Sequence, residues 1–280
     1  MREIEVSRIA ERIRDLCIEA NYTLSEDMRD VLREAGARER SPLGRQVLDK
    51  LEDNLEIAAQ DEIPICQDTG MAVVFLEIGQ EVHLTGGSIE EAVNEGVRRG
   101  YAEGYLRKSV VDDPLLRRNT KDNTPAVIHY KITDGESVRI TVAPKGFGSE
   151  NMSRVFMLKP ADGEAGVRQA ILAAVQDAGP NACPPMVVGV GIGGTFEKCA
   201  ELAKRALLLP ADVHSELPHI RAMEEEVLES INRTGIGPAG LGGSTTALAL
   251  HILTYPTHIA GLPVAVNICC HVNRHASCEI

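Results

Sequence analysis

The feature that most constrains this sequence is the placement of its cysteines in segments that do not read as helix. Cys66 follows a short apolar run, Cys183 comes directly before two prolines, and Cys269 and Cys270 end an apolar run near the C-terminus. The prolines stiffen the Cys183 loop and exclude a helix there. The chain has no closely spaced Cys-x-x-Cys pair of the kind that zinc ribbons and ferredoxins use. A site that uses these thiols together must therefore be assembled by the whole fold.

The core of this chain must be aliphatic, because only 3% of its 280 residues are aromatic and none is Trp. The hydrophobic share of 44% and the charged share of 25% are typical of a soluble globular protein. The length suits one large or two ordinary domains, and we find no internal repeat, low-complexity segment or clear linker. We therefore predict a single domain over residues 1–280.

Helical patterns occupy the N-terminal part of the chain. Residues 3–20 place apolar side chains on one face. Ser25 suits the N-cap of a second helix that stops near Gly36, and Ser41-Pro42 begins a third, with proline at the first helical position. We predict a helical layer that leads into the Cys66 loop.

Strand patterns follow this layer. Residues 63–65 read as the end of a strand, and residues 71–78 read as another, rich in Val, Ile and Phe. Residues 126–133 and 137–143 alternate apolar and polar side chains around Asp134-Gly135, which predicts a β-hairpin. We predict an α+β fold, in which the helical layer surrounds mixed or antiparallel sheets whose loops carry the functional site.

A Gly-x-Gly-x-x-Gly motif at residues 189–194 follows an apolar strand and precedes a predicted helix over residues 197–209. A dinucleotide-binding unit would then return to a second parallel strand that carries an acidic residue. Residues 211–232 instead read as further helix, and residues 244–255 as a short apolar helix. We therefore predict no nucleotide site, and interpret the glycines as permitting close strand–helix packing or a backbone approach to a bound group.

The net charge of −12 and the pI of about 5.2 argue against nucleic acid or an anionic membrane surface as a partner. The N-terminus lacks a signal-peptide apolar core, and prolines, histidines and a glycine interrupt the longest apolar tract, residues 245–270. We predict a cytoplasmic protein, in which reduced cysteines favour a metal-binding or catalytic use over disulfides.

Three loops carry chemically active side chains. Residues 66–69 supply a thiol, an amide, a carboxylate and a hydroxyl in succession. Residues 112–125 carry Arg117 and Arg118 without periodicity, which fits either an anion clamp or a solvated surface loop. In residues 144–151, glycines beside Lys145 would let backbone N–H groups approach an anion.

Three thiolates can hold a cubane iron–sulfur cluster and leave one iron open as a Lewis acid. Cys269 and Cys270 point to opposite faces if strand geometry persists there, so we expect only one of them to be a ligand. Two alternatives remain open at this point. A redox protein would hold its cluster with a full set of ligands, and a structural zinc protein could use His271 or His258 as a fourth ligand.

Six motifs, in this order along the chain, resemble those of the class I (iron–sulfur) fumarase family, and specifically the alpha subunit of its two-subunit members. The family also includes L-tartrate dehydratase. The match extends from about residue 40 to the C-terminus. The motifs are Ile65-Cys66-Gln67-Asp68-Thr69-Gly70, Arg117-Arg118-Asn119-Thr120-x-Asp122-Asn123-Thr124-Pro125-Ala126, Pro144-Lys145-Gly146-x-Gly148-Ser149-Glu150-Asn151, Ala182-Cys183-Pro184-Pro185, Gly242-Gly243-Ser244-Thr245-Thr246 and Cys270-His271-x-x-Arg274-His275.

The resemblance implies roles for individual residues. The three ligands of a [4Fe–4S] cluster would be Cys66, Cys183 and Cys270, since the Cys-His-x-x-Arg-His register selects Cys270 over Cys269. Asp68 would be the proton-transfer group. The implied substrate-binding residues are Gln67, Arg117, Gly148 and His258.

The resemblance also implies an activity and a partner. We expect the alpha subunit of a hydro-lyase that reversibly adds water to a small dicarboxylate, with fumarate to (S)-malate as the first expectation. The alternatives are an L-tartrate dehydratase alpha subunit or, in a different class, a non-catalytic metal-binding protein. A beta subunit would supply the rest of the active site, in an α2β2 assembly without nucleic acid or membrane.

Overall fold

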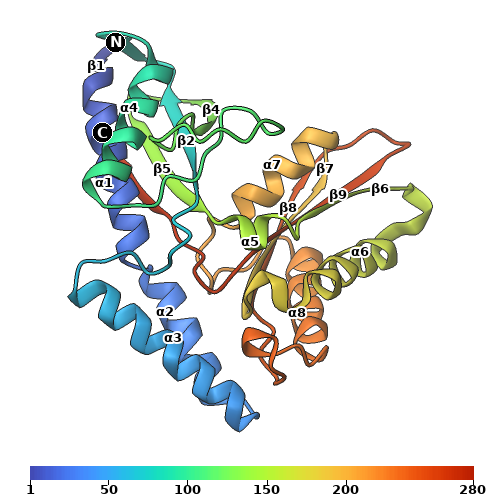
Figure 1. Cartoon of the computed structure of the whole chain (residues 1–280). Coiled ribbons are helices and arrows are strands. Elements are labelled where there is room, and N and C mark those ends of the chain that lie inside the picture. Colours follow the sequence, from blue (N-terminus) through green and yellow to red (C-terminus); the bar gives the residue numbers. More distant parts are fainter. The chain divides into compact units, whose positions relative to one another are not determined.

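The computed structural model describes residues 1–280 and divides the chain into two compact units. The first unit contains residues 1–25, 55–147 and 274–280, and the second contains residues 26–54 and 148–273. Each unit has its own sheet and its own helices (Figure 1). The architecture is α+β with mixed sheets, as the sequence predicts.

The first unit is built on a four-stranded sheet with β2 in its interior. The strand order is β10-β5-β2-β4, where β2 runs parallel to β4 and antiparallel to β5. A buried interior strand needs apolar side chains on both faces, and β2 supplies an almost unbroken apolar run. The bounds of the four strands are β2 Met71–Gly79, β4 Val127–Thr133, β5 Val138–Lys145 and β10 Ala276–Glu279.

Two helices, α1 (Val6–Tyr22) and α4 (Ile89–Glu103), pack on one face of this sheet. Their apolar side chains and those of the sheet form the main core of the first unit. Ser88 caps α4 by accepting a hydrogen bond from the Glu91 N–H. The prediction of helix from residue 3 was wrong at its start. Residues 2–5 form β1 (Arg2–Glu5), which pairs in parallel with β3 (Val82–Thr85), and α1 begins only after this pairing ends.

The predicted hairpin was also wrong. Both strands exist, as β4 and β5, but β2 lies between them. The turn at Gly135 crosses over the end of β2, where the Gly79 N–H donates to the Ser137 carbonyl at 2.9 Å. Alternation and turn residues fix strand identity and not pairing, and β2 is the most apolar strand available to fill the interior position. Residues 63–65, predicted as the end of a strand, lie in a loop.

The second unit has a sheet in the order β6-β9-β7-β8, covered on both faces. Helix α7 (Phe196–Ala206) packs on one face, and α6 (Gly163–Ala178) and α8 (Pro218–Asn232) pack on the other. Strand β7 runs parallel to β8 and antiparallel to β9. The strand bounds are β6 Arg154–Leu158, β7 Met186–Gly193, β8 Ala247–Tyr255 and β9 Leu262–Cys269.

Strand β8 corrects the prediction of a helix over residues 244–255. A short, mostly apolar run has no clear periodicity that separates a buried strand from a buried helix. As a result, the parallel strand that seemed to be missing after the glycine motif is present, although β8 ends on Tyr255 and not on an acidic residue. The packing interpretation of the motif is confirmed: a Cβ on Gly189 or Gly191 would lie 2.3 or 2.0 Å from carbonyl oxygens of α7.

The remaining elements are helical. The hairpin of α2 (Glu26–Arg38) and α3 (Pro42–Gln60) confirms two of the predicted helices, and α3 begins in the second unit and ends in the first. The shorter elements are α5 (Phe147–Glu150) and the 3-10 turns η1 (Pro160–Asp162), η2 (Gly179–Ala182) and η3 (Pro238–Gly240). None of the helices combines the length and the apolar character needed to cross a bilayer.

We expect His251 in β8 to make the fold sensitive to acid. Its side chain is 1% exposed, and burial, with the nearby His214, lowers its pKa from 6.5 to about 4. The folded state therefore keeps the ring neutral. The stability that this provides is complete above pH 6.5 and is lost as the pH falls towards 4.

Between pH 7.5 and pH 5 the wild type should lose roughly 2 kcal/mol of unfolding free energy that a His251→Leu variant keeps. Urea denaturation at the two pH values measures this difference. Glu39, whose pKa is lowered to about 2 from 4.5, does not interfere at pH 5. Equal losses in the two proteins would contradict the prediction.

Candidate functional site

The Cys66–Gly70 loop lies at the start of β2 in the first unit. The Asp68 N–H points at the Cys66 sulfur, with 3.4 Å between nitrogen and sulfur. The Asp68 carboxylate accepts from the Gly70 N–H at 3.1 Å and from the Phe147 N–H at 2.9 Å. These contacts fix the half-buried thiol and the carboxylate on neighbouring positions of one short loop.

Three buried side chains hold this loop from other elements of the first unit. The Tyr101 hydroxyl on α4 donates to the Thr69 carbonyl at 2.6 Å and to the Gly70 carbonyl at 3.1 Å. Burial raises the pKa of Tyr101, so the hydroxyl keeps its proton. Asn123 donates to Gly70 at 3.2 Å, and the Arg274 guanidinium donates to the Asp68 carbonyl. The loop is thus preorganised by its own protein environment.

Arg117, the residue expected to bind a carboxylate, is exposed on a long loop of the first unit. A β-bridge between Val111 and Asn119 closes this loop, and Arg117 has a positive φ of 59° near the tip of the loop. Arg118 pairs with Asp112 at 3.4 Å. The polar segment is therefore ordered by its own contacts.

Arg107 is a second candidate cation, which the sequence reasoning missed. It lies shortly before the same loop, and its carbonyl accepts a hydrogen bond from the Thr69 hydroxyl at 3.0 Å. This contact places the Arg107 backbone beside the Cys66–Gly70 loop. The only sequence signal was its position shortly before the long polar segment of residues 112–125, which does not separate it from its neighbours.

Cys183 and Cys270 lie at one edge of the sheet in the second unit. Cys183 precedes β7 and Cys270 follows β9, and these strands are antiparallel neighbours in which Val187 pairs with Cys269. The two loops are in contact, since the His271 Nδ1 lies 3.1 Å from the Cys183 carbonyl oxygen. Cys183 is exposed and has a left-handed backbone with φ of 53°.

Burial distinguishes Cys66, Cys183 and Cys270 from most of the other cysteines. Cys17, Cys199 and Cys269 are buried, and burial raises the pKa of Cys17 to about 12 and raises that of Cys199. Cys278 is half-buried on β10, and burial raises its pKa too. The buried side chain of Cys269, at the end of β9, favours its half-buried neighbour Cys270 as the ligand.

The remaining predicted residues are placed as follows. Gln67 is exposed, and its Oε1 lies 3.4 Å from the Cys66 sulfur. Gly148 is exposed in α5, and a Cβ there would approach the Asn181 carbonyl near Cys183. His258 follows β8, at the opposite edge of the sheet from Cys183 and Cys270, and its Nδ1 accepts from the Ala260 N–H. The structure therefore does not bring His258 to the two thiols of its own unit.

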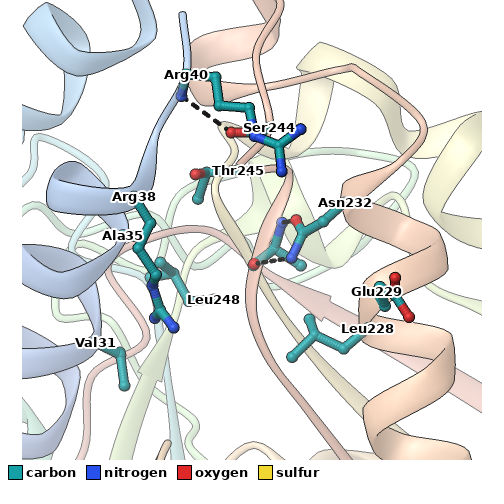
Figure 2. A pocket seen from close by; sticks show the side chains of 11 residues that line it. Val31, Ala35, Arg38, Arg40, Leu228, Glu229, Asn232, Ser244, Thr245 and Leu248 are labelled. Atoms are coloured by element: carbon teal, nitrogen blue, oxygen red, sulfur yellow. Dashed lines mark hydrogen bonds between the residues drawn. The ribbon is translucent and has the colours of Figure 1, made fainter.

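Cys66 belongs to the first unit and Cys183 and Cys270 to the second, and within either unit no group of three His, Cys, Asp or Glu side chains could hold a metal ion. The donor chemistry fits an iron–sulfur cluster, because the three candidate ligands are cysteines outside disulfide bonds, on non-helical backbone and outside the core. A cavity of about 400 Å³ lies elsewhere in the second unit, lined by α2, α8 and the start of β8 (Figure 2). None of the predicted site residues lines it.

Comparison with known proteins decides the family. A sequence model of the family described as fumarate hydratase (Fumerase) matches residues 10–279. The chain belongs to the fumarate hydratase (Fumerase) family. This confirms the resemblance drawn from the six motifs.

Two relatives of this Fumerase family chain are informative. It is 40% identical to a protein of Methanocaldococcus jannaschii that is provisionally named L(+)-tartrate dehydratase subunit alpha, over 96% of each chain. It is 28% identical to the L(+)-tartrate dehydratase subunit alpha of Escherichia coli strain K12, over 97% of this chain and 90% of that one. The family description and these names are those of hydro-lyases, so this chain is an enzyme chain of the hydro-lyase class.

Proposed function

We propose that this chain is the alpha subunit of an iron–sulfur hydro-lyase that removes water from a four-carbon 2-hydroxy dicarboxylate, with L-tartrate as its preferred substrate. The observation that carries the proposal is the full-length similarity to tartrate dehydratase alpha subunits, and three cysteines outside the core and outside disulfide bonds support it. The sequence alone placed fumarate first, and the names of the relatives favour the alternative. Fumarate remains the second candidate because of the family description.

Cys66, Cys183 and Cys270 would hold a [4Fe–4S] cluster in this proposal. When bound, the cluster supplies an open iron that acts as a Lewis acid towards the departing hydroxyl. The N–H of Asp68 directed at the Cys66 sulfur supports thiolate ligation, because hydrogen bonds to sulfur stabilise its negative charge. The exposed Cys183 and half-buried Cys270 are accessible for ligation in neighbouring loops.

The side chains of this chain would orient the substrate and move its proton. Asp68 takes the proton alpha to a substrate carboxylate. Its oxygens accept from the Gly70 and Phe147 N–H groups, and each keeps a lone pair for a proton. An arginine neutralises that carboxylate so that charge can develop on it during proton removal. Gln67 offers an amide to a substrate hydroxyl, and Gly148 a backbone contact.

We further propose that the two units act as one domain, since the family match covers both and the chain passes between them several times. The relatives are named as alpha subunits, which supports a beta subunit that completes the site, and we propose an α2β2 assembly. None of the seven cysteines forms a disulfide, which suits a cluster protein of a reducing cytoplasm.

Arg117 and its neighbour Arg118 offer a matched test of the carboxylate clamp. Arg118 already pairs with Asp112, whereas Arg117 has no side-chain partner. If Arg117 binds a carboxylate, Arg117→Ala should raise KM about tenfold or more, the value of one charge-assisted hydrogen-bonded pair. Arg118→Ala should change KM by less than about twofold.

Arg107→Ala completes this series. A large rise in KM for the Arg107 variant and none for the Arg117 variant would contradict the role given to Arg117 and transfer it to Arg107. Steady-state kinetics on the reconstituted complex of alpha and beta chains measure all three variants under the same conditions.

Substrate comparison tests the proposed function. The reconstituted complex is assayed with L-tartrate, (S)-malate and fumarate, with oxaloacetate detected from tartrate. A site that binds both hydroxyl groups of tartrate should reject malate, which lacks one, so kcat/KM should favour L-tartrate by about tenfold or more. A preference for malate and fumarate would establish the second candidate, and no turnover of any dicarboxylate would refute both.

A further inference from the structure

A buried carboxylate outside the predicted site accepts hydrogen bonds from two serines. Glu39 lies in the turn between α2 and α3 and is fully buried. Its carboxylate accepts from the Ser41 N–H at 2.8 Å, from the Ser244 N–H at 2.9 and 3.0 Å, and from the Ser244 hydroxyl at 3.1 Å. Ser244 is distant in the sequence, so Glu39 joins the α2–α3 turn to the glycine-rich segment before β8.

The surroundings of Glu39 are shaped to receive an ionised carboxylate. Burial opposes its ionisation, but the hydrogen bonds from Ser244, Ser41 and Thr245 outweigh that cost and lower its pKa to about 2. Gly243 has a φ of 146°, and a Cβ at this position would lie 2.9 Å from the Glu39 carboxylate oxygen. The Gly243-Ser244 sequence therefore lets the backbone close on the charge.

The segment that Glu39 holds is also fixed from its other side. The Arg40 N–H, in the same turn as Glu39, donates to the Ser244 hydroxyl at 3.2 Å (Figure 2). On the other side, the Asn232 amide at the end of α8 donates to the Ala247 carbonyl at 3.1 Å. The Asn232 carbonyl oxygen accepts from the Thr246 N–H at 2.7 Å. Residues 244–247 are thus held at both ends.

The loop of residues 236–246, which leads into β8, braces the turn that carries Cys183. The Met186 N–H donates to the Thr246 carbonyl at 2.8 Å, and the Ala239 N–H donates to the Pro184 carbonyl at 2.8 Å. Pro184 and Pro185 have no N–H groups, so this turn is poor in donors with which to stabilise itself. The two bonds from the neighbouring loop fall on either side of Pro185.

We propose that Glu39 is a positioning residue for Cys183, acting through the loop of residues 236–246. The Glu39 carboxylate fixes Ser244, and Ser244 in turn fixes the C-terminal end of the loop at Thr246. The loop then holds the Cys183 turn on both sides of Pro185. The role of Cys183 as a cluster ligand rests on the proposed function. The contacts that lead from Glu39 to Pro184 are independent of that function.

Hydrogen exchange on the apo full-length chain tests the proposal with three variants. Glu39→Gln keeps the size but loses the charge, and Glu39→Asp keeps the charge on a shorter side chain. Glu34→Gln is the matched control, because Glu34 lies on α2 and makes only an exposed pair with Arg38. The Met186 and Ala239 amides should exchange at least tenfold faster in Glu39→Gln, less so in Glu39→Asp, and unchanged in Glu34→Gln.

Two exchange patterns would overturn the role of Glu39. One is faster hydrogen exchange at the Ser244 amide without change at the Met186 and Ala239 amides, which would limit the effect of Glu39 to Ser244. The other is equal acceleration at every amide of the second unit, which indicates general destabilisation. Exchange at Gly70, in the first unit, should not change.

Loss of iron to a chelator extends the test to the holo chain. After anaerobic reconstitution, Glu39→Gln should release iron several-fold faster than Glu34→Gln, and equal rates would overturn a role in holding the ligand. If the wild type takes up no cluster, the proposed function fails, while the exchange pattern still decides whether Glu39 positions the Cys183 turn.

Discussion

Replacement of Cys66, Cys183 or Cys270 by serine is expected to abolish hydro-lyase activity, with a loss of about a thousandfold or more. Each thiol lies in a separate non-helical loop, so no neighbouring cysteine can take its place without moving the backbone. The variants should also fail to retain iron after anaerobic reconstitution. Activity and bound iron, measured on the same samples, check this prediction.

Cys269→Ser is the sharpest control, because it changes the residue next to Cys270 and tests the register directly. Its side chain is buried at the end of β9, so this variant should lose stability and retain iron. Cys278→Ser, on β10, should also retain iron. A Cys270→Ser protein with full iron content, beside a Cys269→Ser protein without iron, would show that the register is wrong.

The alpha chain alone is expected to be inactive, with activity at least on the order of a hundredfold below that of the complex with its beta chain. A dicarboxylate has two negative ends, and both must be held to align the reacting carbons. Arg117 or its alternative Arg107 is exposed and can hold one end, but Lys145 is buried, with its ammonium donating to the Gly146 carbonyl. A second chain is the expected source of further cations.

Assay of the reconstituted alpha chain with and without its beta chain tests this requirement. The cluster should be present in both samples, so that the difference reports on the missing substrate contacts and not on the metal. Full activity from the alpha chain alone would refute the need for a partner.

Element type was well predicted where a pattern was long. The helices α2 and α3 and the strands β2 and β7 were confirmed, because apolar periodicity and β-branched runs act locally. Strand pairing was not predictable in the same way. The hairpin prediction failed because β2 occupies the position between β4 and β5, a contact that no local pattern encodes.

The wrong prediction of a helix over residues 244–255 also arose because a local pattern does not encode strand pairing. The run from Ala247 to Tyr255 is apolar throughout most of its length, so neither period 2 nor period 3.6 is visible. Its parallel pairing with β7 decides that it is a strand. The conclusion against a nucleotide site had rested on the absence of that strand, and it now rests on the missing acidic residue and on the close packing of Gly189 and Gly191 against α7.

For the candidate site, the sequence supplied the residues but not their supports. Cys66 and Asp68 stood out because polar groups interrupted apolar runs. The side chains that hold their loop were not assigned that role, because Tyr101 reads as a core residue of a helix and Arg274 was one position of the C-terminal motif with no role given. Glu39 was invisible for the same reason: only the fold brings Ser244 to it.

Iron and acid-labile sulfide analysis, combined with electron paramagnetic resonance after one-electron oxidation, tests the central claim most directly. About four irons and four sulfides are expected per reconstituted chain, with a three-iron signal on oxidation because one iron has no protein ligand. Zinc without sulfide would indicate a structural metal site. A cluster that keeps all its iron on oxidation would indicate a fully ligated electron carrier, and either result would contradict a cluster held by three cysteines.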